Sequence, residues 1–192
     1  MTETGSVECR RGGGGAAFET LHAVALAVWL AVVVGAGMAA AVVFPTMKEL
    51  DPTLPGFVAS PGDHWLIAGG HVGRTVFAIS DRVQPVCVVI AVVSLAALTR
   101  MQRVGWGWLS IRWSLVGGAG VMAVASGVWL SPRMDANLVA YWEATKAGRV
   151  VEAGIYRRAF DADHPKASTL LSVTAGSVLL AIAGAAASRG RK

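Results

Sequence analysis

The sequence predicts an all-α membrane protein, a four-transmembrane-helix bundle with short amphipathic helices between spans three and four. Hydrophobic residues make up 54% of the 192 residues and charged residues only 15%, so one soluble core cannot hide the apolar surface and part of it must face lipid. The apolar residues also gather in four runs, each near the roughly 20 residues that a helix needs to cross a bilayer. The runs cover residues 21–44, 83–99, 113–131 and 167–188.

The four runs are expected to be helices because hydrocarbon offers no partner to an exposed backbone N–H or C=O. Ala, Gly and Leu dominate the runs, and they lack the alternation of a barrel strand. The second run is short by itself, but it extends backward through Arg82, Asp81 and the apolar residues 75–79. The first run is too long for the apolar part of a signal peptide, so we expect it to be retained.

The runs divide the chain into three parts. Residues 1–17 have too few apolar side chains to pack and are expected to form a mobile N-terminal tail. Residues 18–188 form the four-helix transmembrane domain, and residues 189–192 form a basic C-terminal tail. A short basic turn, 100–107, joins spans two and three. A loop after the first span is expected to contain four prolines, Pro45, Pro52, Pro55 and Pro61.

The segment 135–163 is long enough to contain structure outside the membrane. Its apolar residues repeat at helical spacing on both sides of Gly148. The two groups are Leu138, Tyr141 and Trp142, and then Val151, Ile155 and Phe160. This pattern predicts two short amphipathic helices that lie near the membrane interface.

The distribution of charge predicts an orientation. Because the number of spans is even, both termini lie on one side of the membrane together with the turn 100–107. That side holds eight Lys and Arg residues against three acidic residues, whereas the other side holds nine against nine. Lys and Arg near the spans are enriched on the cytoplasmic side. Both termini are therefore expected in the cytoplasm.

Small residues repeat every four positions along three of the runs. Such strips let helix backbones approach closely, so they predict packing within one bundle, with dimerisation as the alternative. The strips are Ala23, Ala27, Ala31, Gly35 and Ala39 in the first run, Ala119, Ala123 and Gly127 in the third, and Ser177, Ala181 and Ala185 in the fourth.

Ionisable residues in the second helix predict a polar face at its noncytoplasmic half. His71, Arg74, Asp81 and Arg82 share one broad helical face by their three- and four-residue spacing. Ionisable groups in a span are costly unless they are paired or hydrated, so these side chains should face the bundle or its mouth. Arg74 is a natural partner for Asp81. Such a face can either fix helix register through ion pairs or line a route for ions or substrates.

The third and fourth helices bring further polar residues to the same end. Arg133 ends the third span, and His164 and Ser168 open the fourth at four-residue spacing, with Pro165 in the first turn. His164 is expected to accept a hydrogen bond from Arg133. The predicted polar cluster consists of His71, Arg74, Asp81, Arg82, Arg133, His164 and Ser168.

A metal site at this end is a further hypothesis with less support. The available ligands are His64, His71, His164, Asp63, Asp161 and Asp163, which form no compact ligand motif. His22 and His164 open helices on opposite sides of the membrane, roughly 30 Å apart, which does not suit a bis-histidine haem. Cys9 and Cys87 indicate neither a disulfide nor a zinc site. We therefore expect no metal and no cofactor.

The sequence contains no P-loop, nucleophile elbow, HExxH or CxxC motif. The common hydrolase mechanisms thus have no visible residues, and we expect a protein that is not an enzyme. The net charge of +5 belongs to the flanks of the spans and to anionic lipid headgroups, so no nucleic-acid partner is expected.

Three short motifs resemble the transmembrane protein 205-like family, small four-span proteins whose bacterial members include domains of unknown function. Phe44 and Pro45 resemble the family's proline-containing end of the first span. Residues 131–134, Ser-Pro-Arg-Met, resemble its "PRI" end of the third span, and Phe160, His164 and Ser168 resemble its F-x3-H-x3-S start of the fourth. The resemblance implies a four-span topology over residues 18–188. Together with the bacterial members, it implies the inner (cell) membrane of a bacterium.

Three functions fit these features. The first is a noncatalytic scaffold or accessory subunit whose polar noncytoplasmic end recognises a partner or stabilises an assembly. The second is a component of a small-solute or ion transporter that works as a homo-oligomer, with Arg74, Asp81, Arg82, Arg133 and His164 lining a route. The third is a metal-binding or redox membrane protein that uses His71 and His164.

Overall fold

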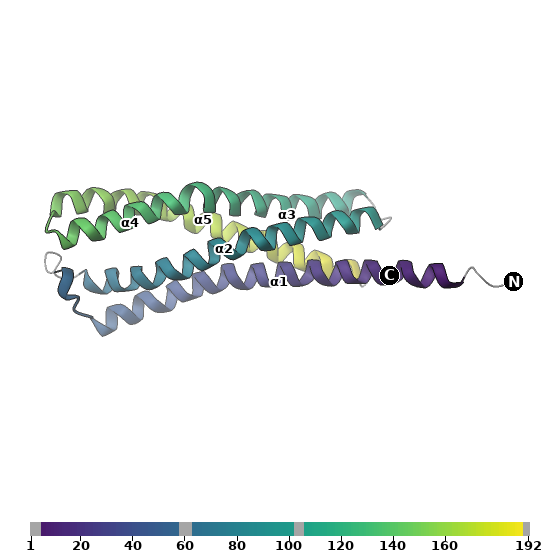
Figure 1. Ribbon diagram of the computed structural model, residues 1–192, viewed down its shortest axis with the longest axis horizontal. Helices are drawn as coiled ribbons and strands as arrows, with labels where there is room; N and C mark the ends of the chain where they lie inside the picture. The colour runs from purple at the N-terminus through teal and green to yellow at the C-terminus, as the bar shows by residue number, and fades with distance from the viewer. Residues whose placement is uncertain (1–4, 58–62, 102–105, 190–192) are drawn as a thin grey trace.

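The computed structural model describes residues 5–57, 63–101 and 106–189, and no described residue lies in a strand. The elements are α1 (Gly5–Leu50), the 3-10 turn η1 (Pro55–Phe57), α2 (His64–Met101), α3 (Trp106–Ala125), the π-helical η2 (Ser126–Leu130), α4 (Ser131–Lys146) and α5 (Val150–Arg189). Four candidate spans, of 37 to 40 residues, are long and apolar enough to cross a membrane. The structure confirms the predicted all-α four-helix bundle. α1 begins and α5 ends at the same end of the bundle, which we call the terminal end (Figure 1).

The third span and the first predicted amphipathic helix form one continuous rod of α3, η2 and α4 (Figure 1). Pro132 near the start of α4 has no N–H, and its ring would clash with the carbonyl four residues earlier in a regular α-helix. The chain opens into one π turn, in which the Ser131 N–H bonds the Ser126 oxygen. The two predicted amphipathic helices are thus continuous with the spans, since the first, α4, continues the third span through η2 and the second is the beginning of α5; their place at the membrane interface stays a prediction.

The turn between α4 and α5 was predicted in the right place. Gly148 adopts a positive φ of 72°, which glycine reaches without steric cost. After this turn, α5 runs unbroken from Val150 through Pro165 to Arg189. Pro165 therefore lies inside a helix, and its predicted place in the first turn of the fourth helix is wrong.

The first helix is longer than the first apolar run at both ends. α1 begins at Gly5, within the predicted tail 1–17, and whether that segment is mobile stays a prediction. It continues through Pro45 to Leu50, so Pro45 belongs to a helix and not to the predicted loop. Pro61, which was also assigned to that loop, lies outside the described residues.

Large side chains of α1 fill the bundle core. Leu26, Trp29 and Val33 are at most 1% exposed and pack in one hydrophobic cluster with small residues of the other helices. Those small partners include Ala91, Ala119 and Ala181. The predicted strips of the third and fourth runs are thus confirmed at Ala119, Ala123, Ala181 and Ala185, which are all buried.

The small-residue strip of the first run does not pack as predicted. Its central members, Ala27, Ala31 and Gly35, are exposed on the outer surface of the bundle. The face of α1 that packs against the bundle carries Leu26 and Trp29, whose large side chains fill the space between the helices, and Trp29 also bonds Gln84. The small residues that α1 does bury, Ala25 and Ala36, lie outside this strip.

Contacts between helices place the polar ends of the apolar runs at one level of the bundle. Asp81 lies near Ser131, and Arg133 pairs with Asp163, so the polar ends of α2, α3 and α5 lie at one level. From Asp81 to Arg100, α2 spans about 28 Å, which matches the roughly 30 Å of bilayer hydrocarbon. The helices continue for about 25 Å beyond Asp81, as judged from the 17 residues back to His64.

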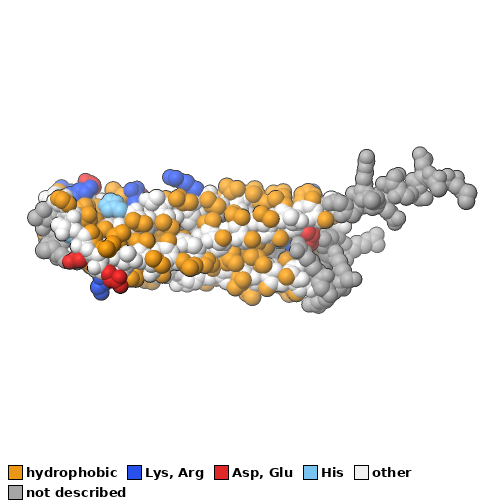
Figure 2. Space-filling model, turned by 90° about the horizontal axis from the view of Figure 1, so that it is seen from below, with side chains coloured by type: hydrophobic (Ala, Val, Ile, Leu, Met, Phe, Trp, Pro, Cys, Tyr) orange, Lys and Arg blue, Asp and Glu red, His pale blue; other side chains and the backbone are white. Residues whose placement is uncertain are grey.

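We call this continuation the headpiece and define it as residues 33–57, 63–80 and 131–166. Figure 2 shows charged side chains gathered toward this end, while the rest of that face is largely apolar. The headpiece has its own core, in which Ile67 of α2, Trp142 of α4 and Ala153 of α5 are at most 6% exposed. Phe57 of η1 closes this core at the tip.

α1 stays apolar alongside the charged headpiece. Trp29 bonds Gln84, and Phe44 lies against Gly69, so Asp81 is level with about residue 33 of α1. The apolar run of α1 continues past this level to Phe44. Its outward side chains there form a stripe at four-residue spacing, which we call the α1 stripe. The stripe consists of Val34, Met38 and Val42, which are 41%, 63% and 63% exposed.

Candidate functional site

Polar contacts between α2 and α4 form a ladder along the headpiece. The imidazole of His71 stacks on the indole of Trp142, with ring centroids 3.7 Å apart and planes inclined by 25°. Arg74 donates two hydrogen bonds to the carboxylate of Asp135, one of them 3.0 Å from Nη2 to Oδ2. Further along α2, Asp81 lies near Ser131 at the start of α4. The ladder fixes the register of α2 against α4.

A buried carboxylate joins α4 to α5. Asp163 has a fully buried side chain, and Arg133 donates to both of its oxygens, at 2.6 Å from Nε and 2.7 Å from Nη2. Lys166 adds a third charge-assisted hydrogen bond of 2.9 Å. A buried carboxylate needs such partners because it has lost its hydration.

Two further contacts close the tip of the headpiece. His64 fixes the loop before it, because Nδ1 accepts from the Leu54 N–H at 2.9 Å while Nε2 lies 3.0 Å from the Phe57 oxygen. Arg157 of α5 donates to Asp63 at 2.5 Å and so ties α5 to the start of α2. These contacts hold the tip as one packed unit.

The structure separates the predicted cluster into paired and unpaired members. Arg74 bonds Asp135 and not Asp81, so the predicted pair within α2 is wrong. Arg133 bonds Asp163 and not His164. The reason is that α4 lies directly beside α2 and α5, so that it brings Asp135 to Arg74 of α2 and brings its own Arg133 to Asp163 of α5.

The remaining members do not join these contacts. Arg82 is exposed and forms no ion pair or hydrogen bond with any residue in the described part of the chain. His164 is also exposed and stacks on Phe160 at 5.6 Å, while the Ser168 hydroxyl donates to the His164 carbonyl of its own helix. The seven residues therefore come from the same end, but they do not form a single cluster.

Sequence reasoning missed the acidic partners. Asp135 and Asp163 complete the two inter-helix pairs, and Asp63 completes the third. One signal for Asp135 was present, because it lies two residues after Arg133 and thus at the polar end of the third span. The rotation of α4 that turns it toward Arg74 has no signal in the sequence of α4 itself.

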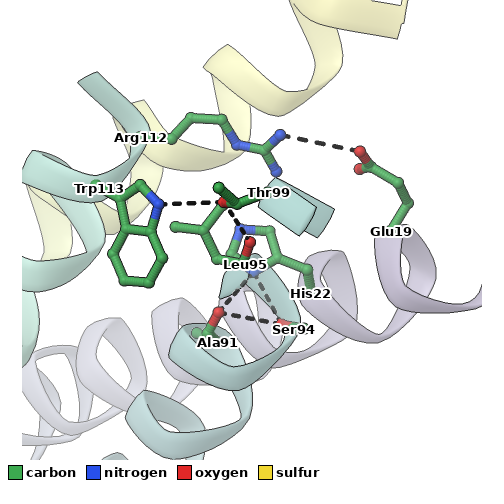
Figure 3. Close-up of polar contacts among 8 residues, drawn as sticks. All are labelled: Glu19, His22, Ala91, Ser94, Leu95, Thr99, Arg112 and Trp113. Atoms are coloured by element: carbon green, nitrogen blue, oxygen red, sulfur yellow. Dashed lines mark hydrogen bonds and ion pairs between the residues drawn. The ribbon is translucent and has the colours of Figure 1, made fainter. Parts of the chain in front are cut away.

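A second polar cluster, which sequence reasoning also missed, lies near the terminal end (Figure 3). His22 of α1 is 1% exposed, and its Nδ1 lies 3.0 Å from the Ala91 oxygen and 3.1 Å from Ser94 Oγ in α2. A backbone carbonyl only accepts, so Nδ1 carries the proton. Nε2 is buried and has no hydrogen-bond partner among the described residues. The sequence signal was a histidine at the start of an apolar run.

Charged and aromatic groups surround this histidine. The Arg112 guanidinium of α3 is buried and lies 3.9 Å from a carboxylate oxygen of Glu19 (Figure 3). Trp113 donates to the Thr99 hydroxyl at 3.2 Å. The second polar cluster, which we define as Glu19, His22, Ser94, Thr99, Arg112 and Trp113, thus links α1, α2 and α3.

Buried polar groups continue along α2 toward the headpiece. The Trp29 indole donates to Gln84 at 3.3 Å, and Gln84 donates to the Ser80 hydroxyl at 3.2 Å. Between Gln84 and Ser94, the core is filled by apolar side chains that are at most 5% exposed, including Leu26, Cys87 and Ala91. The two polar regions are therefore separated by a close-packed apolar layer.

The described residues contain no group of three or more His, Cys, Asp and Glu side chains that could hold a metal ion. His71 and His164 are each stacked on a different aromatic ring, Trp142 and Phe160, which occupy different helices. The two imidazoles that the redox hypothesis used are thus held in separate contacts.

Comparisons of this chain with models of protein families, with curated proteins and with solved structures found no match. The resemblance to the transmembrane protein 205-like family therefore stays a prediction that rests on the three motifs.

Proposed function

We propose that this chain is a noncatalytic membrane scaffold or accessory subunit whose headpiece recognises a partner or stabilises an assembly. One observation carries the proposal: a headpiece with its own core continues about 25 Å past the level where three of the apolar runs end. Its helices are joined by ion pairs across α2, α4 and α5. Such a unit presents a fixed surface, as recognition requires.

The α1 stripe gives the headpiece a surface for a partner. Met38 and Val42 are each 63% exposed at the level where α2, α4 and α5 carry their charged groups. Exposed apolar patches bordered by polar residues are typical of protein–protein interaction sites. A partner helix of a membrane complex, or of a second copy of this chain, would cover such a stripe.

The orientation belongs to the same proposal. The density of Lys and Arg near the spans supports a terminal end in the cytoplasm and a headpiece on the opposite side. The motifs shared with bacterial four-span proteins support the inner membrane of a bacterium. A headpiece on that side would meet partners outside the cytoplasm.

Transport is the second candidate, and the buried polar groups of α2 favour it. Ser80, Gln84 and Ser94 all point into the bundle core. The apolar layer of Leu26, Cys87 and Ala91 between them opposes a continuous route within one copy. A transporter would therefore need a rearrangement of this layer or a route between copies.

Purification of the full chain from its native membrane, followed by identification of copurifying proteins, tests the proposal. The matched variants are Met38→Gln with Val42→Gln, and the control Val151→Gln with Ile155→Gln, which changes exposed apolar positions of α5 in the headpiece at the same spacing. We expect a stoichiometric partner, a membrane protein or a second copy, with the wild type and the control and its loss with the α1 variant. Solute flux into liposomes by the purified chain, abolished by Gln84→Leu, would instead establish transport.

A further inference from the structure

An open apolar groove runs along the outside of the bundle between α2 and α3. Its volume is about 450 Å³, within the range of pockets that hold small ligands. A Cβ added at Gly117 would meet no atom within 4 Å, so this glycine leaves the floor of the groove open. Val88, Val92, Val116, Gly120, Val121 and Val124 form much of the remaining lining.

The position of the groove indicates a hydrocarbon occupant. Val88 and Val92 lie within the apolar run 83–99 of α2, and Gly117 lies within the run 113–131 of α3. The groove extends from Val116 to Ala125, about 14 Å along α3. This length is close to that of one leaflet, which is half of the roughly 30 Å of hydrocarbon.

The headpiece end of the groove leads to exposed cationic and aromatic groups. Arg82 is exposed on α2 and lies six residues, about 9 Å along the helix axis, from Val88. Trp129, on the same rod, is 62% exposed, and the Arg133 guanidinium lies 5.7 Å from the centre of its ring. Tryptophan and arginine are typical of the level of lipid headgroups.

The two arginines differ in the charge that they can offer. Arg133 already neutralises the buried carboxylate of Asp163. Arg82, in contrast, has no acidic partner in the described ranges and keeps its full positive charge at the hydrocarbon boundary. An ion at this boundary is stabilised by pairing with an opposite charge, and a guanidinium binds phosphate through two parallel hydrogen bonds.

We propose that the groove holds an acyl chain of one anionic glycerophospholipid whose phosphate pairs with Arg82. The headgroup lies beside Arg82 and Trp129, and the chain enters the groove at Ala125 and follows Val121 and Gly117 toward the bilayer centre. The charge of Arg82 selects an anionic headgroup, and the apolar lining holds the chain. The lipid thereby fills the surface gap between α2 and α3.

Native mass spectrometry of the full chain in detergent with added phosphatidylglycerol or phosphatidylcholine of identical chains tests this proposal. We expect one retained lipid and a preference of at least about fivefold for phosphatidylglycerol, since one charge-assisted pair is worth about 1 kcal/mol or more. Arg82→Gln removes the preference, whereas Arg158→Gln, an exposed charge of the headpiece, preserves it. Gly117→Leu fills the groove and reduces retention of both lipids, and the milder Gly117→Ala reduces it less.

The control for the groove is Gly176→Leu, because Gly176 is an exposed glycine of α5 that also has open space at its Cβ. Circular dichroism and the unfolding temperature verify that each variant is folded. Equal retention of both lipids by the wild type overturns the proposal, as does an unchanged preference in Arg82→Gln. A lipid-free dimer that Gly117→Leu dissociates also overturns it, since a second copy would then occupy the groove.

Discussion

Arg133 donates two hydrogen bonds to the fully buried carboxylate of Asp163, at 2.6 and 2.7 Å. This pair lies close to the level where the apolar run 113–131 ends and the headpiece begins. It joins α4 to α5, while the ladder of contacts from His71 to Arg74 joins α2 to α4. The headpiece is thus held by contacts between helices that are far apart in sequence.

Asp163→Asn should destabilise the chain more than any single change in the exposed ion pairs. The variant loses the negative charge that Arg133 and Lys166 surround and places an amide N–H₂ among donors. We expect the unfolding temperature in detergent to fall by roughly 5 °C or more. An unchanged unfolding temperature would mean that water reaches the Asp163 carboxylate and replaces its bonds to Arg133 and Lys166.

The pair between Arg74 and Asp135 should contribute little to stability. Their side chains are 46% and 43% exposed, so water screens the attraction. A double-mutant cycle with Arg74→Gln and Asp135→Asn should give a coupling free energy of about 0–1 kcal/mol. A coupling free energy well above that range would show that water does not screen the attraction between Arg74 and Asp135.

The four helices could be predicted from the apolar runs because lipid demands long uncharged segments with internally bonded backbones. Their lengths could not, because proline at positions 45 and 165 indicated helix ends on local grounds. Packing against neighbouring helices keeps α1 and α5 intact at both positions. The π turn before Pro132 likewise accommodates a proline within a long helix. As a result, α4 lies alongside α2.

The polar ends of the helices could be located by spacing, but their partners could not. Periodicity gives the face of one helix, as it did for Arg74 and Asp81, and says nothing about the rotation of the neighbour that meets it. Asp135 reaches Arg74 only because α4 continues α3 in a straight line. A helix lying on the membrane would have left Arg74 with partners on α2 alone.

The proposed orientation predicts which end a membrane-impermeant thiol reagent reaches in intact cells. In a chain with Cys9→Ser and Cys87→Ser, Val151→Cys should react from outside, because Val151 is 82% exposed at the tip of the headpiece. Met101→Cys, 48% exposed at the terminal end, should react only after the cells are broken. The opposite labelling pattern would place the termini outside the cytoplasm and reverse the orientation.

His22 should stabilise the contact between α1 and α2 near the terminal end. His22→Leu removes the donor to Ala91 and Ser94 and leaves a buried carbonyl oxygen without this donor, at a cost of about 1–3 kcal/mol. Ser94→Ala should cost less, since the Ser94 hydroxyl also donates to the Ile90 oxygen of its own helix. Chemical unfolding of both variants in mixed micelles measures which of them loses more free energy of unfolding. A larger loss for Ser94→Ala would assign the main contact to the serine.

The position of α1 beside the headpiece decides whether the α1 stripe faces outward. The Phe44 ring packs on the Gly69 backbone so closely that a Cβ there would lie 2.8 Å from Cδ1. Gly69→Val should therefore push α1 away from α2 at this end and cost about 1–3 kcal/mol through overpacking. Gly37→Val, at a glycine of α1 with open space at its Cβ, should change stability much less and is the control.

The same pair of variants separates stability from recognition. If the partner binds the α1 stripe, Gly69→Val should lose the copurifying protein at temperatures where the bundle is still helical, because only the outer part of α1 has moved. A double variant, Phe44→Leu with Gly69→Val, relieves the clash by removing the ring. It should restore both the stability of the bundle and the binding of the partner. A bundle in which Gly69→Val is as stable as Gly37→Val would show that Phe44 does not rest on this glycine and that α1 is oriented differently beside the headpiece.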